Sequence, residues 1–369
     1  MDVATRRAVL ESAVVAIALV TGLAPIPAAV VERWFSTGIY PAIQRAVTPI
    51  SNFVPFAVLD VIGAVALAAV VLVIVRAVRS AWRTRRAMPL LRAAGHLLAA
   101  LACGYLVFLV LWGFNYRRVP MGERLLVGRE APTSDAVLQL GLDAVARMNS
   151  LHAEAHRAGW QDEEWRNRSL RDAFNSVQHV LADAPDAEPG RLKRSLLGVY
   201  FRWASIDGMV NPFGLEVLAN PDLLPFERPF VAAHEWSHLA GYADESEANF
   251  VGWLTCIRAD VPAQYSGWLF LFWQVNGEVD QAGRARLGEA LAPGPRADIQ
   301  AIVERLRRAQ VPWLRNAGWA VYDQYLKANR VEEGVRSYGA VVTLILRARF
   351  EQGWTPVRRP AAAGRPAGS

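Results

Sequence analysis

The stretch VAAHEWSHLAGYADESEANF, residues 231–250, carries the side chains best suited to metal chemistry. On a helix, positions four apart share one face, so His234 and His238 can point at one ion. Two imidazoles suit zinc, and a catalytic zinc site keeps an open position for water. Glu235 is placed to take a proton from that water. The motif therefore predicts one Zn²⁺ ion, with Glu235 as the general base.

The residues after the motif predict a second helix that returns beside the first. Gly241 stands where a helix C-cap is expected, and Asp244 can cap the next helix with Glu247 as its capping-box partner. In such an antiparallel hairpin, Glu245 comes level with the histidines and is predicted to be the third metal ligand, with Glu247 as the alternative. Asn249 shares the face of Glu245 and is predicted to hydrogen-bond a ligand histidine.

A second histidine pair precedes the motif in the chain. His152 and His156 are also four residues apart, within the sequence HAEAH. They lie on a charged helix, predicted over 134–159, and no carboxylate partner is near them in sequence. We therefore expect this pair to be solvated surface.

Substrate contacts are predicted on both sides of the motif. NPFG reads as a turn and LEVLAN as a short strand, whose free edge could bind an extended peptide. Glu216, Val217 and Leu218 are the predicted substrate-binding residues, although a purely structural hairpin fits the pattern equally well. Tyr325 and Tyr338 are candidates for stabilising an oxyanion, and each alone is also compatible with an ordinary half-buried tyrosine.

Three apolar segments at the start of the chain predict a membrane anchor. Hydrophobic residues make up 53% of the chain, and they concentrate in residues 8–31, 53–75 and 93–114. Each segment has about the 20 residues that a helix needs to cross the hydrocarbon core. The first could be a cleaved signal peptide, but the two spans that follow favour an uncleaved anchor.

The distribution of arginine predicts the orientation of the anchor. The loop between the second and third segments, RAVRSAWRTRRAMPLLR, is rich in arginine, whereas the first loop is not. Positive loops stay in the cytoplasm, so the N-terminus is expected inside and the chain after residue 115 outside. The net charge of +6 is thus attributed to membrane orientation, and no nucleic-acid partner is expected. Two cysteines are too few for a disulfide framework.

These patterns predict a mainly α fold. Three N-terminal transmembrane helices, residues 1–114, are expected to lead into a mostly helical, zincin-like α+β domain with a small sheet, residues 115–355. The Pro-, Ala-, Gly- and Arg-rich tail, residues 356–369, is predicted to be disordered.

The motifs also resemble two known groups of proteins. His-Glu-x-x-His followed by Glu-x-x-x-Asn resembles the gluzincin metallopeptidases. In that group the first acid of the second motif is a zinc ligand, and the last residue of that motif, more commonly Asp, supports a histidine. WGFNYRR, NPFGLE, HEWSHLAGYADESEANF, VYDQYLKANR and GVRSYGAVV resemble a bacterial membrane family catalogued as domain of unknown function 3810. That family usually has Pro-Phe-Thr-Gly-Glu where this chain has PFGLE. The resemblance implies a place in the bacterial cytoplasmic membrane and brings no substrate with it.

The resulting hypothesis is a membrane-anchored zinc metallopeptidase with an extracytoplasmic catalytic domain. Its partners would be the lipid bilayer and a peptide or protein substrate of the cell envelope, with a cell-wall or lipid-linked amide as another candidate substrate. The alternative is a metal-binding envelope scaffold or sensor without catalysis. A transporter is disfavoured, because the spans carry few internal charges.

Overall fold

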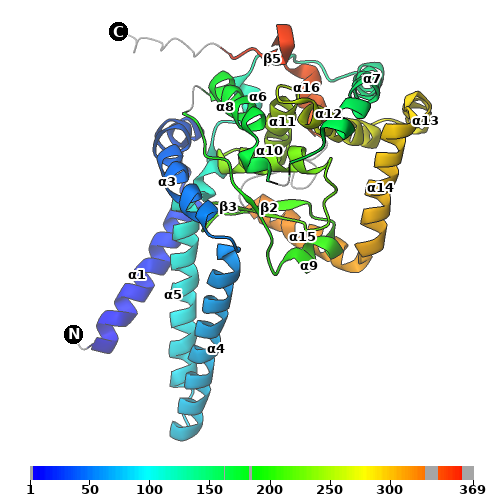
Figure 1. Ribbon diagram of the computed structural model, residues 1–369. Helices are drawn as coiled ribbons and strands as arrows, with labels where there is room; N and C mark the ends of the chain where they lie inside the picture. The colour runs from blue at the N-terminus through cyan, green and yellow to red at the C-terminus, as the bar shows by residue number, and fades with distance from the viewer. Residues whose placement is uncertain (1–2, 162, 183–184, 329–339, 360–369) are drawn as a thin grey trace, which may run out of the picture.

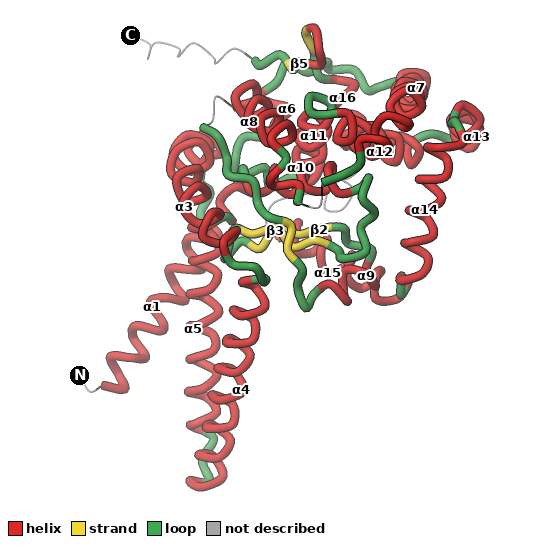
Figure 2. The backbone as a smooth tube through the Cα atoms, in the orientation of Figure 1, coloured by secondary structure: helices red, strands yellow, loops and turns green. Residues whose placement is uncertain are grey.

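The computed structural model describes residues 3–161, 163–182, 185–328 and 340–359. As predicted, the chain is mainly helical with small sheets (Figure 2). Two long helices project from a globular body, and a third leans against them (Figure 1). The N-terminal elements are α1 (Val3–Leu23), α2 (Ala28–Val30), the π-helix η1 (Val31–Ile39), α3 (Tyr40–Phe53), α4 (Val58–Thr84) and α5 (Met88–Leu111).

The body is built from short and medium helices around small sheets. Its helices are η2 (Gly113–Arg117), α6 (Met121–Arg124), α7 (Ser134–Ala158), η3 (Glu164–Arg166), α8 (Arg168–Ala182), α9 (Gly198–Ala204), α10 (Arg228–Leu239), α11 (Glu245–Cys256), α12 (Val261–Glu278), α13 (Gln281–Ala290), α14 (Pro293–Ala309), α15 (Pro312–Ala328), α16 (Ala340–Arg347) and η5 (Gln352–Trp354). Its strands are β1 (Leu192–Lys193), β2 (Gly208–Asn211), β3 (Glu216–Ala219), β4 (Phe350–Glu351) and β5 (Thr355–Pro356).

Two described helices, α4 and α5, are long and apolar enough to cross a membrane. The predicted first span is broken instead: α1 ends at Leu23, and the helix that resumes at Ala28 is bent from it by 106°. Pro25 and Pro27 lie in the break and lack the N–H groups that would continue the helix. The count is therefore two spans, or three if the bent pair forms one. The other two spans are also displaced from their predicted bounds, because α4 begins only after Pro55 and α5 begins at Met88.

The arginine-rich segment lies at the tip of the α4–α5 hairpin, far from the body (Figure 1). It is mostly helical rather than a loop, since α4 continues to Thr84. Apolar side chains along α1, α4 and α5, including Leu10, Val65 and Leu101, are exposed. Such surfaces are compatible with association with a lipid bilayer.

The sheet beneath α10 has the strand order β1-β3-β2. β1 pairs with β3 in parallel, and β2 pairs with it antiparallel, with Asn211 opposite Glu216 and Gly208 opposite Ala219. The predicted strand LEVLAN is present as β3, but it is the central strand. The predicted free edge is therefore wrong, and the substrate-binding role of Glu216, Val217 and Leu218 loses its basis.

Glu216 instead joins the sheet to the membrane hairpin. Its fully buried carboxylate accepts from Lys193 Nζ at 2.8 Å and from the backbone N–H groups of Val58 and Leu59 at 3.0 and 2.8 Å. Those two N–H groups open α4, where a negative charge complements the helix dipole. Burial raises the pKa of Glu216, but the bond from Lys193 and the backbone donors hold it below its ordinary value.

The hydrophobic core lies between α7, α12 and the α10–α11 pair. Helix α7 matches the amphipathic helix predicted over 134–159, with Val145 and Met148 buried in the core and Thr133 as its N-cap. The core also contains the fully buried indoles of Trp236 and Trp253.

The start of the predicted disordered tail is paired. Leu126 N–H donates to Val357 O at 2.8 Å, and Arg359 N–H donates to Arg124 O at 2.8 Å. The tail prediction is therefore wrong for residues 356–359, while residues 360–369 lie outside the described residues.

Candidate metal centre

Helix α10 ends in the turn that the sequence predicted. Gly241 has φ of +89°, the left-handed region that favours glycine. Its N–H donates to His238 O, and Tyr242 N–H donates to Ser237 O, both at 3.0 Å. These two bonds form a Schellman motif, which ends the helix directly after the second histidine.

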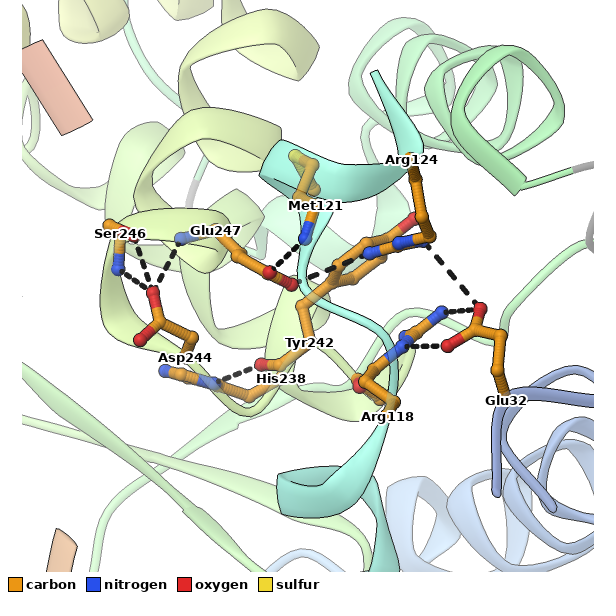
Figure 3. Close-up of polar contacts among 10 residues, drawn as sticks. Glu32, Arg118, Met121, Arg124, His238, Tyr242, Asp244, Ser246 and Glu247 are labelled. Atoms are coloured by element: carbon orange, nitrogen blue, oxygen red, sulfur yellow. Dashed lines mark hydrogen bonds and ion pairs between the residues drawn. The ribbon is translucent and has the colours of Figure 1, made fainter. Parts of the chain in front are cut away.

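Helix α11 then returns against α10. Asp244 caps it by accepting from Ser246 and Glu247 N–H, as Figure 3 shows. A β-carbon at Gly252 would lie 3.0 Å from His234 N, so the two helices touch through backbone. The predicted antiparallel hairpin is therefore present, and it places Glu245 opposite the histidines.

Three side chains converge from the two helices. His234 Nε2 and His238 Nε2 lie 3.1 Å apart, and Glu245 Oε2 lies 3.4 and 3.6 Å from them. Ligand atoms around a tetrahedral zinc with bonds of about 2.0–2.2 Å lie roughly 3.3–3.6 Å apart. The two carboxylate–histidine distances lie within this range and the histidine–histidine distance is slightly shorter, so the donor set suits one zinc ion, with a fourth position left for water.

The charges at the centre also favour a cation. Burial lowers the pKa of His238, but the facing Glu245 carboxylate outweighs it and raises the pKa to about 9. Burial raises the pKa of Glu245, but His238 and His234 hold it well below its ordinary range. An ionised carboxylate thus faces a protonated imidazole, and a metal ion would take the place of that proton.

Groups next to the membrane anchor hold the C-terminal end of α10. Trp112, directly after α5, donates its indole N–H to His238 O at 2.8 Å, and Tyr40 O–H donates to Leu239 O at 2.6 Å. Arg118 donates to Gly241 O at 2.8 Å. Sequence reasoning missed these residues, although Trp112 and Arg118 belong to the WGFNYRR motif.

The second nitrogen of His238 is also fixed. Its Nδ1 lies 2.7 Å from Tyr242 O, within the same turn (Figure 3). A backbone carbonyl at this position requires Nδ1–H, which leaves Nε2 free to bind a metal.

Glu247, the alternative ligand, faces away from the histidines. It accepts from Met121 N–H and pairs with Arg124 Nη2 at 3.4 Å (Figure 3). Its carboxylate does not accept from the backbone N–H of Asp244, so the capping-box bond predicted for Glu247 is wrong. Arg118 pairs with Glu32 in a two-bond arrangement, at 3.0 and 2.8 Å. This network links α11 to η1 of the anchor.

Asn249 is buried, but it makes no hydrogen bond to either histidine within the described part of the chain. Its Nδ2 and the Nδ1 of His234 are each buried without a hydrogen-bond partner among the described residues. The support that the sequence assigned to Asn249 is instead supplied to His238 by Tyr242 O. Support of His234 by Asn249 stays a prediction.

Glu235 lies beside the edge strand β2. It is buried, and its Oε2 has no hydrogen-bond partner in the portion of the chain that the structure describes. Burial raises its pKa, against the opposing effect of the two histidines. A β-carbon at Gly208 would lie 2.5 Å from Glu235 Oε1, so only glycine allows this approach. Within the described chain β2 pairs only with β3, so its other edge is unpaired there, and the Glu235 carboxylate lies against Gly208 of this strand.

The two predicted oxyanion donors fall outside the side chains that the structure describes. Tyr325 lies on α15, but its side chain is outside the described part of the chain, and Tyr338 lies wholly outside it. Their roles stay predictions.

His152 and His156, predicted to be plain surface, share a carboxylate. Asp298 Oδ2, from α14, lies 2.9 Å from His156 Nε2 and 3.5 Å from His152 Nε2. The expectation of solvated surface rested on the lack of a carboxylate nearby in sequence, and the carboxylate that the pair meets stands 142 residues further along the chain than His156.

Comparison with known proteins gives one match. A family model described as Protein of unknown function (DUF3810) matches residues 35–346, a range that includes α4, α5 and the α10–α11 hairpin. No curated protein and no solved structure matches the chain significantly.

Proposed function

The chain belongs to the DUF3810 family, and on that premise we propose that it is a membrane-anchored zinc-dependent metallopeptidase. The observation that carries the proposal is the triangle of His234, His238 and Glu245, with ligand atoms 3.1 to 3.6 Å apart. A buried carboxylate, Glu235, adjoins this triangle, and one of its oxygens has no hydrogen-bond partner among the residues described. A purely structural zinc site takes four protein ligands, whereas these three leave an open position.

The three ligands would hold one zinc ion, which when bound supplies Lewis acidity for a water and a substrate carbonyl. Glu235 accepts a proton from the water and returns it to the leaving amine. Its raised pKa suits both transfers, because a general base works best when its pKa lies near the working pH. The Schellman turn and Trp112 keep His238 in register with Glu245.

The edge of β2 that has no partner strand among the described residues is the proposed binding edge for substrate. An extended peptide that hydrogen-bonds to this edge would run past Glu235, because Gly208 brings the strand against the carboxylate. This replaces β3, whose two edges are both paired. The scissile bond is a peptide or related amide of the cell envelope.

We also propose that the body lies outside the cytoplasm. The arginine-rich tip of the α4–α5 hairpin lies at the opposite end of these helices from the body (Figure 1). Positively charged loops stay cytoplasmic, so the body falls on the other side of the bilayer. We expect activity from a reporter enzyme that works only outside the cytoplasm when it is fused after residue 359. If only a reporter that works in the cytoplasm is active there, the proposed orientation is wrong.

The decisive experiment compares wild type with Glu235→Gln in membranes of the producing cells. Peptides released from the envelope are identified by mass spectrometry, and zinc is measured in both purified proteins. We expect equal zinc content and loss of peptide release in the variant. Equal release would refute catalysis, and zinc bound by both proteins without any release would favour the scaffold or sensor alternative.

A further inference from the structure

Outside the candidate centre, a second set of metal-binding side chains meets between α7 and α14. His152 and His156 stand one turn apart on α7, and Asp298 on α14 faces both. Asp298 Oδ2 lies 2.9 Å from His156 Nε2 and 3.5 Å from His152 Nε2. One nitrogen of each ring thus points at the same carboxylate oxygen.

The surroundings hold these groups in place. Asp298 is 7% exposed, and Tyr265 on α12 donates its O–H to Asp298 Oδ2 at 2.5 Å. A donor of this kind orients a carboxylate for metal binding. A β-carbon at Gly294, one turn before Asp298, would lie 2.4 Å from the His152 ring. The absence of a side chain at Gly294 lets the ring lie directly against α14.

One side of the cluster reaches solvent. The His156 side chain is 37% exposed, whereas that of Asp298 is 10% exposed. Trp160 packs edge-on against the His156 ring, with centroids 4.8 Å apart. The cluster therefore has an inner wall of aromatic rings and an outer side that water can reach.

We propose that His152, His156 and Asp298 form a second binding site for a divalent transition-metal ion of the zinc class. Two imidazoles and one carboxylate are the ligands that such ions prefer, and water would complete the coordination from the exposed side. The bound ion replaces the hydrogen bond between His156 Nε2 and Asp298 Oδ2. It does not depend on the centre formed by His234, His238 and Glu245.

The position of the site gives it a structural role. Arg305, near the other end of α14, pairs with Asp207 at 3.0 Å and with Glu227 at 2.7 Å. These two acids precede β2 and α10, the elements that carry Gly208 and Glu235. An ion at Asp298 fixes the first half of the same helix to α7. The second site therefore fixes α14, the helix whose Arg305 holds the residues directly before β2 and α10.

The test counts metal ions in the full-length protein in detergent. The protein is stripped with a chelator and dialysed against zinc chloride, and bound zinc is measured by mass spectrometry. We expect two ions in wild type, one in His152→Gln/His156→Gln and one in His234→Ala/His238→Ala. His179→Gln is the matched control, because His179 pairs with Asp186 at 2.9 Å on the exposed surface and belongs to neither set of three ligands. It should keep both ions.

A second measurement separates this proposal from the proposed function. In the His234→Ala/His238→Ala background, zinc should still raise the unfolding temperature, and adding Asp298→Asn should abolish that rise. Asparagine keeps an acceptor for Tyr265, so the fold without metal should be retained. If His152→Gln/His156→Gln binds as much zinc as wild type, the second site is overturned and the first site is unaffected. If His152→Gln/His156→Gln loses an ion and His234→Ala/His238→Ala loses none, the second site is supported and the first is overturned.

Discussion

The indole N–H of Trp112 donates to the backbone carbonyl of His238 at 2.8 Å. Trp112 directly follows α5, so the end of a candidate membrane helix contacts the backbone of a candidate metal ligand. The N-terminal candidate membrane helices are thus part of the support of the candidate metal centre, and deletion of the chain before α6 would remove that support.

Replacing Trp112 by phenylalanine should weaken zinc binding. The ring remains, but the carbonyl of His238 loses one donor, a loss of about 1 kcal/mol or roughly fivefold in affinity. Competition with a fluorescent zinc chelator measures the change. Trp313→Phe is the control, since Trp313 is 71% exposed. Equal affinity in the two variants would contradict the role of Trp112.

The two glutamates of ESEAN should separate in function. Glu245→Gln removes a ligand and should lower zinc affinity about a hundredfold or more, because a neutral amide is a poor zinc ligand. Glu247→Gln weakens the contacts with Met121 and Arg124, so it should lower the unfolding temperature and leave zinc affinity within about threefold. Titration calorimetry and thermal unfolding distinguish the pair, and the opposite pattern would make Glu247 the ligand.

Gly252→Ala should push α11 away from α10. The new methyl group would lie 3.0 Å from His234 N and 3.1 Å from its Cα, and backbone atoms cannot rotate aside. Overpacking of this kind costs about 1–3 kcal/mol, and it shifts Glu245 relative to the histidines. Gly277→Ala on α12 is the control, because no described atom lies within 4 Å of the position that its β-carbon would take. A Gly252→Ala protein as stable as Gly277→Ala would rule out the close contact.

Gly208→Ala should affect catalysis without affecting metal binding. Its methyl group would meet Glu235 Oε1 at 2.5 Å, and the flexible carboxylate can turn away while the backbone stays in place. A displaced base should lower zinc-dependent peptide release by about a hundredfold, with zinc content unchanged. Gly122→Ala, with open space around it, should behave as wild type. Loss of zinc in Gly208→Ala would mean that the strand supports the ligands instead.

The parts of the site that could be predicted from sequence are local. The i, i+4 histidines, the Gly241 turn and the Asp244 cap follow from helical geometry within one short stretch of chain, and all three are present in the structure. The position of Glu245 opposite the histidines followed from the same predicted hairpin.

The parts that could not be predicted depend on residues far apart in the chain. β1 is two residues long and has no pattern of its own, yet it pairs with β3 and turns the expected edge strand into a central one. Asp298 joins His156 across 142 residues. The apolar run 8–31 was continuous in composition, and only the two prolines signalled the bend within it.

The carboxylate of Glu216 should make the protein sensitive to acid. Its pKa in the folded protein lies below its ordinary value of 4.5, so its contribution to stability is complete above pH 4.5 and is lost as the pH falls through the lowered value. Glu216→Gln leaves Lys193 buried without a charged partner, which should cost about 3 kcal/mol at pH 7. The difference from wild type should shrink progressively below pH 4.5. Urea unfolding between about pH 7 and pH 3 measures it, and Glu304→Gln, at an exposed pair with Arg308, is the control. A difference that stays constant across this range would mean that Glu216 has the same pKa in the folded and the unfolded protein, so that its contacts with Lys193 and with the backbone N–H groups of α4 do not favour the ionised carboxylate.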